Sequence, residues 1–194
     1  MGRALAVLAF LLLPAFAQRL QCDATDVRFD FSDPGPLTFV GSYPVANLAG
    51  YLHLFDVGNP LRFLPTGVVG GSQPHRVVCR VTTPRIGGGG GTQCGAGTTW
   101  CLRISSPTGS LPPPLVANTH LLVQVQVVSG NATSHAPSPT RIGNLPDNWG
   151  LASIARNTTA TLWIWFYLEL DPNASFPTLP AGGTLTLTYR LRND

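Results

Sequence analysis

Residues 158–170 read TTATLWIWFYLEL, the longest stretch with strand character in this chain of 194 residues. In a β-strand successive side chains point to opposite faces, so Trp163, Trp165 and Tyr167 share one face. The opposite face then carries Leu162, Ile164, Phe166 and Leu168. Both faces are apolar, and this pattern predicts a central strand that is covered on both sides.

The aromatic face of this strand has three interpretations. It can pack in the core, it can contact another protein, or it can stack on sugars, because a flat aromatic ring matches the face of a pyranose. An exposed aromatic row of this size needs a partner. Trp163, Trp165 and Tyr167 are therefore the candidate interface or sugar-stacking residues, with core packing as the alternative.

Further segments with alternating or short apolar patterns predict the remaining strands. These segments are residues 27–31, 51–55, 61–64, 76–82, 99–104, 121–128 and 184–192. We expect a five-glycine loop within residues 85–97, a stiff proline-rich connector at 107–114 and polar turns at 129–148. Residues 148–155 alone fit a helix, of about two turns. About eight or nine strands without long crossover helices predict an all-β fold, an antiparallel β-sandwich.

The charge composition narrows the class of protein. The chain has 12 Arg, no Lys, eight Asp and one Glu, with 44% hydrophobic residues. So few charges and so much hydrophobicity exclude an intrinsically disordered chain, and the near absence of Glu and Lys argues against a helix-rich fold. No arginine cluster stands out along the sequence, so nucleic acid is not an expected partner. We expect a surface of uncharged polar side chains rather than ion pairs.

The first 17 residues have the order of a secretory signal peptide. Met1-Gly2-Arg3 is a short positive start, residues 4–13 are apolar, and Ala15-Phe16-Ala17 is a small-x-small cleavage site. The apolar run is shorter than the roughly 20 residues that a membrane span needs. We therefore expect cleavage before Gln18, a single domain at residues 18–194, no later transmembrane segment, and a secreted, periplasmic or cell-surface location. The composition suggests a bacterial source with a GC-rich genome.

Four cysteines suit an oxidising compartment. Cys22, Cys79, Cys94 and Cys101 are an even number in an exported chain, so disulfides are expected, and sequence alone allows three connectivities. We favour Cys94–Cys101, which closes a short loop around glycines, and Cys22–Cys79, which attaches the mature N-terminus to a central strand. No C-x-x-C is present and the histidines lack ligand spacing, so no metal site is predicted.

Four aspartates near the mature N-terminus raise the question of calcium. They are Asp23, Asp26, Asp30 and Asp33. Hard cations select oxygen ligands, but the alternating Asp/Asn pattern and fixed glycine of a calcium loop are absent. We expect solvated carboxylates and turn caps instead.

Catalytic motifs are missing from the sequence. There is no G-x-S-x-G, no H-E-x-x-H, and no Lys to complete a phosphate-binding loop around the glycine run. Glu169 is the one glutamate and lies on the apolar strand, so a glycosidase pair would have to use aspartates. We predict a protein that is not an enzyme and that uses no cofactor.

Three pieces of the chain together carry a family resemblance: Cys22, the strand at residues 77–82 that contains Cys79, and Pro180-Ala181-Gly182-Gly183 running into an alternating last strand. They resemble the spore coat protein U and chaperone–usher pilin group. The resemblance implies an immunoglobulin-like β-sandwich that polymerises into surface fibres by strand exchange. Only residues 18–21 precede Cys22, whereas strand donation needs roughly ten residues. The chain would then receive a strand, end a fibre, or assemble through its aromatic face.

These observations together predict an exported, non-enzymatic structural or interaction subunit of a cell-surface or extracellular assembly, pilin-like or coat-like. Its expected partners are other protein subunits or copies of itself. The alternative function is a carbohydrate-binding module that uses the aromatic strand face to bind polysaccharide.

Overall fold

The structure is a computed structural model, and it describes residues 18–29, 61–85, 94, 100–109, 111, 115–146, 149–170 and 183–193. Three sequence-based predictions lie outside these residues. They are the signal peptide, the strand at residues 51–55 and the glycine run at residues 87–91.

The first of two antiparallel sheets is centred on the aromatic strand. Its strands follow the order β1-β5-β11-β7-β9, and β3 pairs with one end of β11. Their bounds are β1 Arg19–Cys22, β3 Leu61–Phe63, β5 Arg76–Thr82, β7 Leu121–Ser129, β9 Thr140–Arg141 and β11 Thr159–Leu170. The strands predicted at residues 61–64, 76–82, 121–128 and 158–170 are confirmed within one or two residues.

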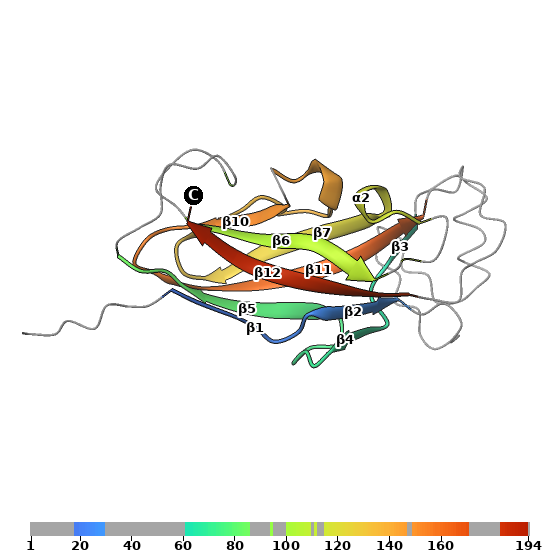
Figure 1. The fold of residues 1–194 in the computed structure, drawn as a ribbon, viewed down its shortest axis with the longest axis horizontal. Helices are drawn as coiled ribbons and strands as arrows, with labels where there is room; N and C mark the ends of the chain where they lie inside the picture. The colour runs from blue at the N-terminus through green and yellow to red at the C-terminus, as the bar shows by residue number, and fades with distance from the viewer. Residues whose placement is uncertain are drawn as a thin grey trace, which may run out of the picture.

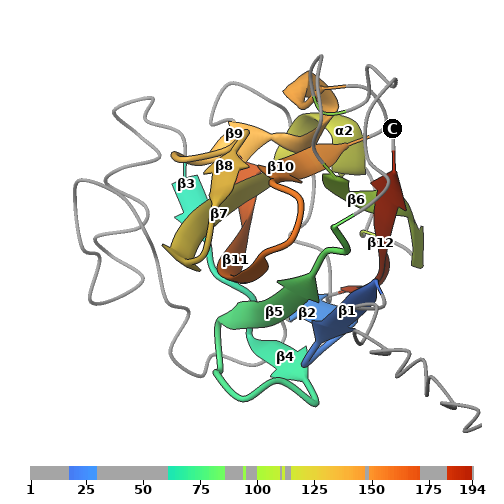
Figure 2. The ribbon, with the colours of Figure 1, turned by 90° about the vertical axis from the view of Figure 1, so that its left-hand side faces the viewer.

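The second sheet has the order β4-β2-β12-β6-β10-β8. Its strands are β2 Asp26–Phe29, β4 Gly67–Val69, β6 Trp100–Gly109, β8 Ala132–Ser134, β10 Gly150–Ile154 and β12 Gly183–Asn193. A short helix α2, Ala117–His120, leads into β7, and a 3-10 turn, Ile142–Asn144, follows β9. Figure 1 shows β12 and β6 crossing in front of β11, with β5 below them, and Figure 2 shows the two layers from one end.

Strand β11 forms the middle of the core. Leu162, Ile164 and Leu168 are completely buried and Phe166 is nearly so, which is the face that the alternation predicts. They join one cluster with inward side chains of the second sheet, such as Leu102 of β6 and Leu187 of β12. Each such side chain contributes roughly 1.5–3 kcal/mol of transfer free energy on burial. The predicted all-β class is confirmed, with two antiparallel sheets around a common core.

The predicted helix at residues 148–155 is wrong. Residues Gly150–Ile154 form β10, which pairs with β6 on one side and β8 on the other. Leu151, Ala152 and Ile154 are fully buried in this strand. Five residues are too few for the local pattern to separate a buried strand from a helical turn, and pairing on both sides decides the conformation.

Two other local predictions differ from the structure. Strand β6 continues through Pro107 to Gly109, where a connector was expected. The register between β6 and β12 shifts between Thr186 and Thr188, and this irregularity accommodates a proline that cannot donate a backbone hydrogen bond. The polar stretch 129–148 contains β8 and β9, of three and two residues, which are too short to leave a pattern. These additions bring the described strands to twelve, rather than eight or nine.

The two disulfides have the favoured connectivity. Cys22 is bonded to Cys79, which lies opposite it in the β1–β5 ladder, and Cys94 is bonded to Cys101 at the start of β6. Because β1 belongs to the first sheet and β2 to the second, the chain crosses between sheets just after Cys22. The Cys22–Cys79 bond therefore fixes the position from which the chain crosses.

We expect the two disulfides to contribute unequally to stability. Their sequence separations are 57 and 7 residues, so loop-closure entropy gives about 4 kcal/mol for the first and about 2.5 kcal/mol for the second. Urea unfolding of C22A/C79A and C94A/C101A measures both losses. An equal or larger loss in C94A/C101A would contradict this ordering.

Candidate functional site

The outer face of the first sheet carries the two tryptophans of β11. Trp163 and Trp165 are half-buried, with ring centroids 6.0 Å apart and planes at 85°, an edge-to-face pair. The Arg76 guanidinium lies 3.6 Å from the Trp163 ring centroid and 5.8 Å from that of Trp165. This cation–π contact orders the pair on a sheet face where a partner can reach it.

Tyr167 does not extend the accessible row, although it lies on the same strand face. Its side chain is only 4% exposed, and its hydroxyl donates a 2.8 Å hydrogen bond to Gln124 Oε1 of β7. Burial raises the pKa of the Tyr167 phenol, and the positive charge of Arg62 partly offsets this effect. The exposed part of the aromatic row is therefore the indole pair, beside which lie Gln124 and Gln126, the β7 partners of Trp165 and Trp163.

An arginine-lined hollow lies over β1 and β5 of the same sheet. It has a volume of about 210 Å³ and is lined by Arg19 and Gln21 of β1 and by Arg80 and Thr82 of β5. No arginine cluster is visible along the sequence, and this pair forms only in the folded chain. Arg19 and Arg80 are 61 positions apart (80 − 19), and only the pairing of β1 with β5 brings them together.

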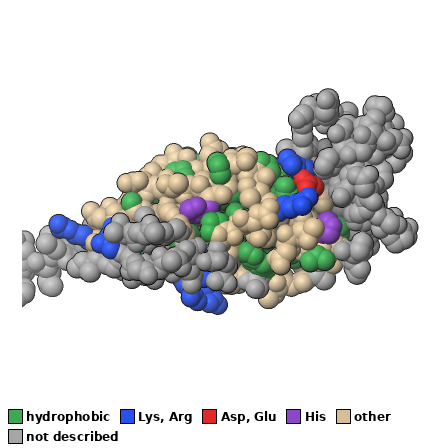
Figure 3. Space-filling model, turned by 90° about the horizontal axis from the view of Figure 1, so that it is seen from above, with side chains coloured by type: hydrophobic (Ala, Val, Ile, Leu, Met, Phe, Trp, Pro, Cys, Tyr) green, Lys and Arg blue, Asp and Glu red, His purple; other side chains and the backbone are tan. Residues whose placement is uncertain are grey.

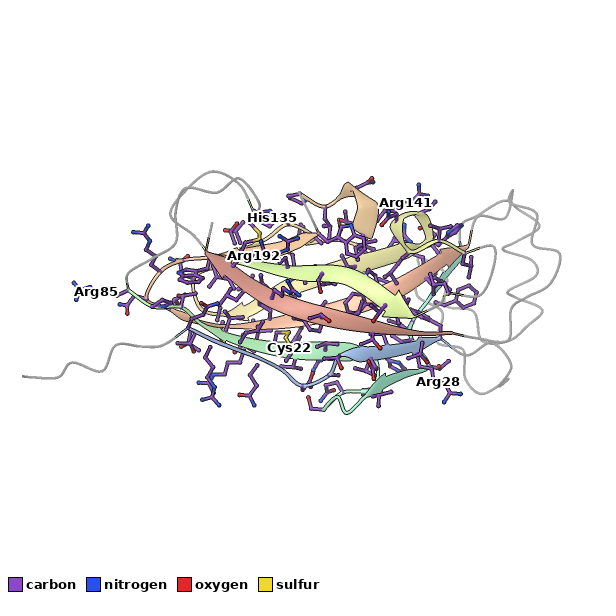
Figure 4. The ribbon with its side chains drawn as sticks, in the orientation of Figure 1. Cys22, Arg28, Arg85, His135, Arg141 and Arg192 are labelled. Atoms are coloured by element: carbon purple, nitrogen blue, oxygen red, sulfur yellow. A yellow bond between two sulfur atoms is a disulfide. The ribbon has the colours of Figure 1, made fainter. Side chains whose placement is uncertain are left out.

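The single glutamate is held in an ion-pair cluster at the end of β11. Glu169 is 7% exposed. Arg62 Nε of β3 donates to Oε2 at 2.8 Å and Arg141 Nη2 of β9 donates to Oε1 at 3.1 Å. Both carboxylate oxygens are thus occupied, one by an arginine of β3, which pairs with β11, and one by an arginine of β9, which pairs with β7; Arg141 is labelled in Figure 4. Its role is to attach short edge strands to the central strand.

Asp23 anchors the chain where it crosses between the sheets. Ser72 donates from its backbone N–H at 2.8 Å and from its hydroxyl at 2.5 Å to Oδ2, and Val78 N–H donates to Oδ1 at 2.8 Å. Burial alone would raise the pKa of Asp23, but these hydrogen bonds outweigh it and lower the pKa below its ordinary value. Asp23 therefore acts as a turn anchor.

The remaining aspartates give no support to a calcium site. Asp30 and Asp33 lie outside the described residues. In the part of the chain that the structure covers, His, Cys, Asp and Glu side chains form no group of three that could hold a metal ion. The fixed partners of Asp23 match the turn-cap interpretation of the acidic cluster.

His135 and Ser153 lie side by side on the second sheet, with 2.8 Å between His135 Nε2 and Ser153 Oγ. The Ser153 hydroxyl donates to the Cys94 carbonyl at 2.7 Å, so the histidine nitrogen is the donor to Ser153. A general base must instead accept the hydroxyl proton. Burial lowers the pKa of His135, and a hydrogen bond to the Cys94 backbone opposes this. The pair links β8 and β10 to the Cys94 segment.

A second hollow lies beside α2. Its volume is about 460 Å³, and it is lined by Pro107, Gly109, Leu111, Leu115, Val116, Ala117, Asn118, Trp149 and Leu185. Trp149 has a φ of 62°, a conformation that costs a residue with a side chain about 1–3 kcal/mol. The described residues around it include no charged side chain that would define a ligand.

Known proteins give no further guidance. A comparison with models of protein families found no match, and comparisons with curated proteins and with solved structures found none. They give no support to the resemblance to spore coat and pilin proteins, which stays a prediction. Among the described residues, no helix is long and apolar enough to cross a membrane.

We expect Asp23→Asn to lower the free energy of unfolding by about 1–3 kcal/mol at pH 7, because hydrogen bonds to a charged acceptor are lost or weakened. Since the folded pKa is lowered, the stabilisation is complete above the unfolded pKa near 4 and is lost as pH falls through the folded pKa. Urea unfolding between pH 7 and 3 should therefore show a smaller acid loss in D23N than in the wild type.

Asp26→Asn is the matched control, because its carboxylate accepts only a 3.4 Å hydrogen bond from Thr25 among the described contacts. Equal losses in D23N and D26N would show that the contacts of Asp23 with Ser72 and Val78 are not the source.

Proposed function

We propose that this protein is an exported, non-enzymatic binding protein that serves as a structural or interaction subunit of a cell-surface or extracellular assembly. The observation that carries the proposal is the half-buried pair Trp163 and Trp165 at the centre of the first sheet's outer face. Large aromatic side chains of this kind dominate the energetics of binding surfaces. The partner-binding surface is therefore the outer face of β5, β11 and β7.

Export is supported by the leader pattern and by the cysteines. Two disulfides use all four cysteines of the chain. Such bonds persist mainly in oxidising compartments outside the cytosol. A largely uncharged surface suits a subunit that packs beside others, because neighbouring copies repel one another little. Figure 3, which views the molecule from above, shows uncharged side chains over most of the described surface in that view.

An immunoglobulin-like sandwich is the finer fold that we propose. It is supported by the two antiparallel sheets around one core and by the crossing of the chain between them after β1. Residues Arg19–Cys22 are already paired with β5, and Cys22 is bonded to Cys79. This pairing holds residues 19–22 within the molecule, so the proposed assembly uses the side contact through the indoles rather than donation of this strand.

Carbohydrate binding is the second candidate function, and one observation favours it. Gln126 is exposed and lies directly beside Trp163 in the β11–β7 register. Its amide group donates and accepts hydrogen bonds, so it suits the hydroxyl groups of a sugar that contacts the indoles. Gln124, beside Trp165, already donates to Pro137 O and accepts from Tyr167.

The first test compares binding of the purified protein to cell-envelope fragments of its producing organism by co-sedimentation. We expect Trp163→Thr with Trp165→Thr to weaken binding by about tenfold or more, because hot-spot aromatics each contribute 1.4 kcal/mol or above. Val69→Thr is the control, since Val69 is exposed on β4 of the other sheet. Circular dichroism and urea unfolding report whether each variant is folded.

Equal envelope binding by the wild type and the folded double tryptophan variant would refute the indole face as the binding surface. Tryptophan fluorescence that stays unchanged on mixing the wild type with the fragments would do the same.

A further inference from the structure

The outer face of the first sheet carries positive charge that the described residues leave without acidic partners. Gln21 lies opposite Arg80 and Arg19 lies opposite Thr82, so the two arginines are diagonal neighbours across β1 and β5. Diagonal neighbours are separated by roughly 7–8 Å, so two long arginine side chains can both reach one anionic group placed between them. Both arginines are exposed and line the 210 Å³ hollow. In the described part of the chain, the salt bridges join Glu169 to Arg62 and Arg141, and neither involves Arg19 or Arg80.

Arg76 adds a third positive charge on the same face. Its guanidinium lies against Trp163, and its Nε is buried without a hydrogen-bond partner. Arg76 and Arg80 lie on the same face of β5. They are four residues apart, which corresponds to about 13 Å at the usual rise along a strand. In Figure 4, nitrogen-tipped side chains project below β1 and β5. Charges spread over this distance suit a ligand with repeated anionic groups rather than a single ion.

The other side chains of this face have a different chemistry. The indole pair adds apolar ring surface beside Arg76, with its two ring planes at 85° and the Arg76 guanidinium 3.6 Å from the Trp163 ring centroid. On the far side, Gln126 presents an exposed amide, whereas the Gln124 amide already donates to Pro137 O and accepts from Tyr167. One kind of polymer has a complementary group for each: repeated carboxylates for the arginines, ring faces for the indoles and hydroxyls for the exposed amide. An acidic polypeptide supplies the charges but neither the sugar rings nor the rows of hydroxyls.

Charge argues against a second copy of this chain on the same face. A two-fold symmetric contact places each surface patch against itself. Arg19, Arg76 and Arg80 would then face their own counterparts, and like charges brought together at an interface cost several kcal/mol. A negatively charged partner converts this cost into attraction.

We propose that the outer face of the first sheet binds an acidic polysaccharide of the uronic-acid type. The Arg19–Arg80 hollow takes carboxylates, the indoles of Trp163 and Trp165 contact sugar rings, and Gln126 binds hydroxyl groups. This inference rests on the proposed function, because it names the ligand class of the same binding face.

The test measures binding of the full-length, exported protein to polygalacturonate, to its methyl ester and to poly-L-glutamate by affinity electrophoresis and tryptophan fluorescence. We expect polygalacturonate to bind and to shift the tryptophan emission. The ester lacks the charges and the polypeptide lacks the rings, so each should bind at least about tenfold more weakly. Added salt should weaken the polygalacturonate complex, because exposed charges are screened.

Two double variants distinguish the effect of the charges in the hollow from the effect of the net charge of the protein. R19Q/R80Q removes the hollow's charges, and R190Q/R192Q removes two exposed arginines from β12 of the second sheet, so both have the same net charge. We expect R19Q/R80Q to lose about tenfold or more in polygalacturonate affinity and R190Q/R192Q to bind like the wild type. Equal affinities for the two variants would overturn the assignment of the hollow.

The remaining outcomes distinguish this inference from the proposed function. Equal binding of the ester would overturn the charge recognition, and equal binding of poly-L-glutamate would overturn the sugar recognition in favour of an acidic protein partner. In both cases the envelope binding of W163T/W165T still decides the proposed function. Normal envelope binding by both W163T/W165T and R19Q/R80Q would overturn the two proposals together.

Discussion

Burial of one face of β11 is the interaction on which the rest of the structure depends. Leu162, Ile164, Phe166 and Leu168 lie between the first sheet and the second and are at most 1% exposed. With β5 and β7 hydrogen-bonded on its two sides, the strand has no freedom to shift register by one residue. Such a shift would move all four apolar side chains to the opposite face. The position of every outer side chain on β11 follows from this constraint.

The binding face that we propose is a consequence of that fixed register. Holding β11 in place sets Trp163 beside Val78 and Gln126, and Trp165 beside Arg76 and Gln124. The Cys22–Cys79 bond then sets β1 against β5 and completes the arginine hollow. The face therefore combines a rigid aromatic centre, a basic flank and an amide flank, each contributed by a different strand. Sites on strands of this kind are held more rigidly than sites on loops.

The few charges of the chain are divided between two uses. Glu169 is buried with Arg62 and Arg141, and Asp23 accepts hydrogen bonds from Ser72 and Val78. These carboxylates join strands or fix a crossing, and their partners satisfy them locally. Arg19 and Arg80 instead face the solvent. In a molecule with so few acidic groups, such arginines create a positive field that an anionic partner can use.

The alternation of residues 158–170 was sufficient to predict the central strand and its two faces, because side-chain direction in a strand depends only on parity. The all-β class followed from the number of strand segments and the lack of long helices. The favoured cysteine pairs followed from spacing and export. Tertiary structure alone decided that Gly150–Ile154 is a strand, that Tyr167 is buried and that Arg19 meets Arg80. These features depend on pairing between segments distant in sequence, and registers between strands are set by the packing of the whole core. A local pattern contains no information about which distant side chain will lie opposite.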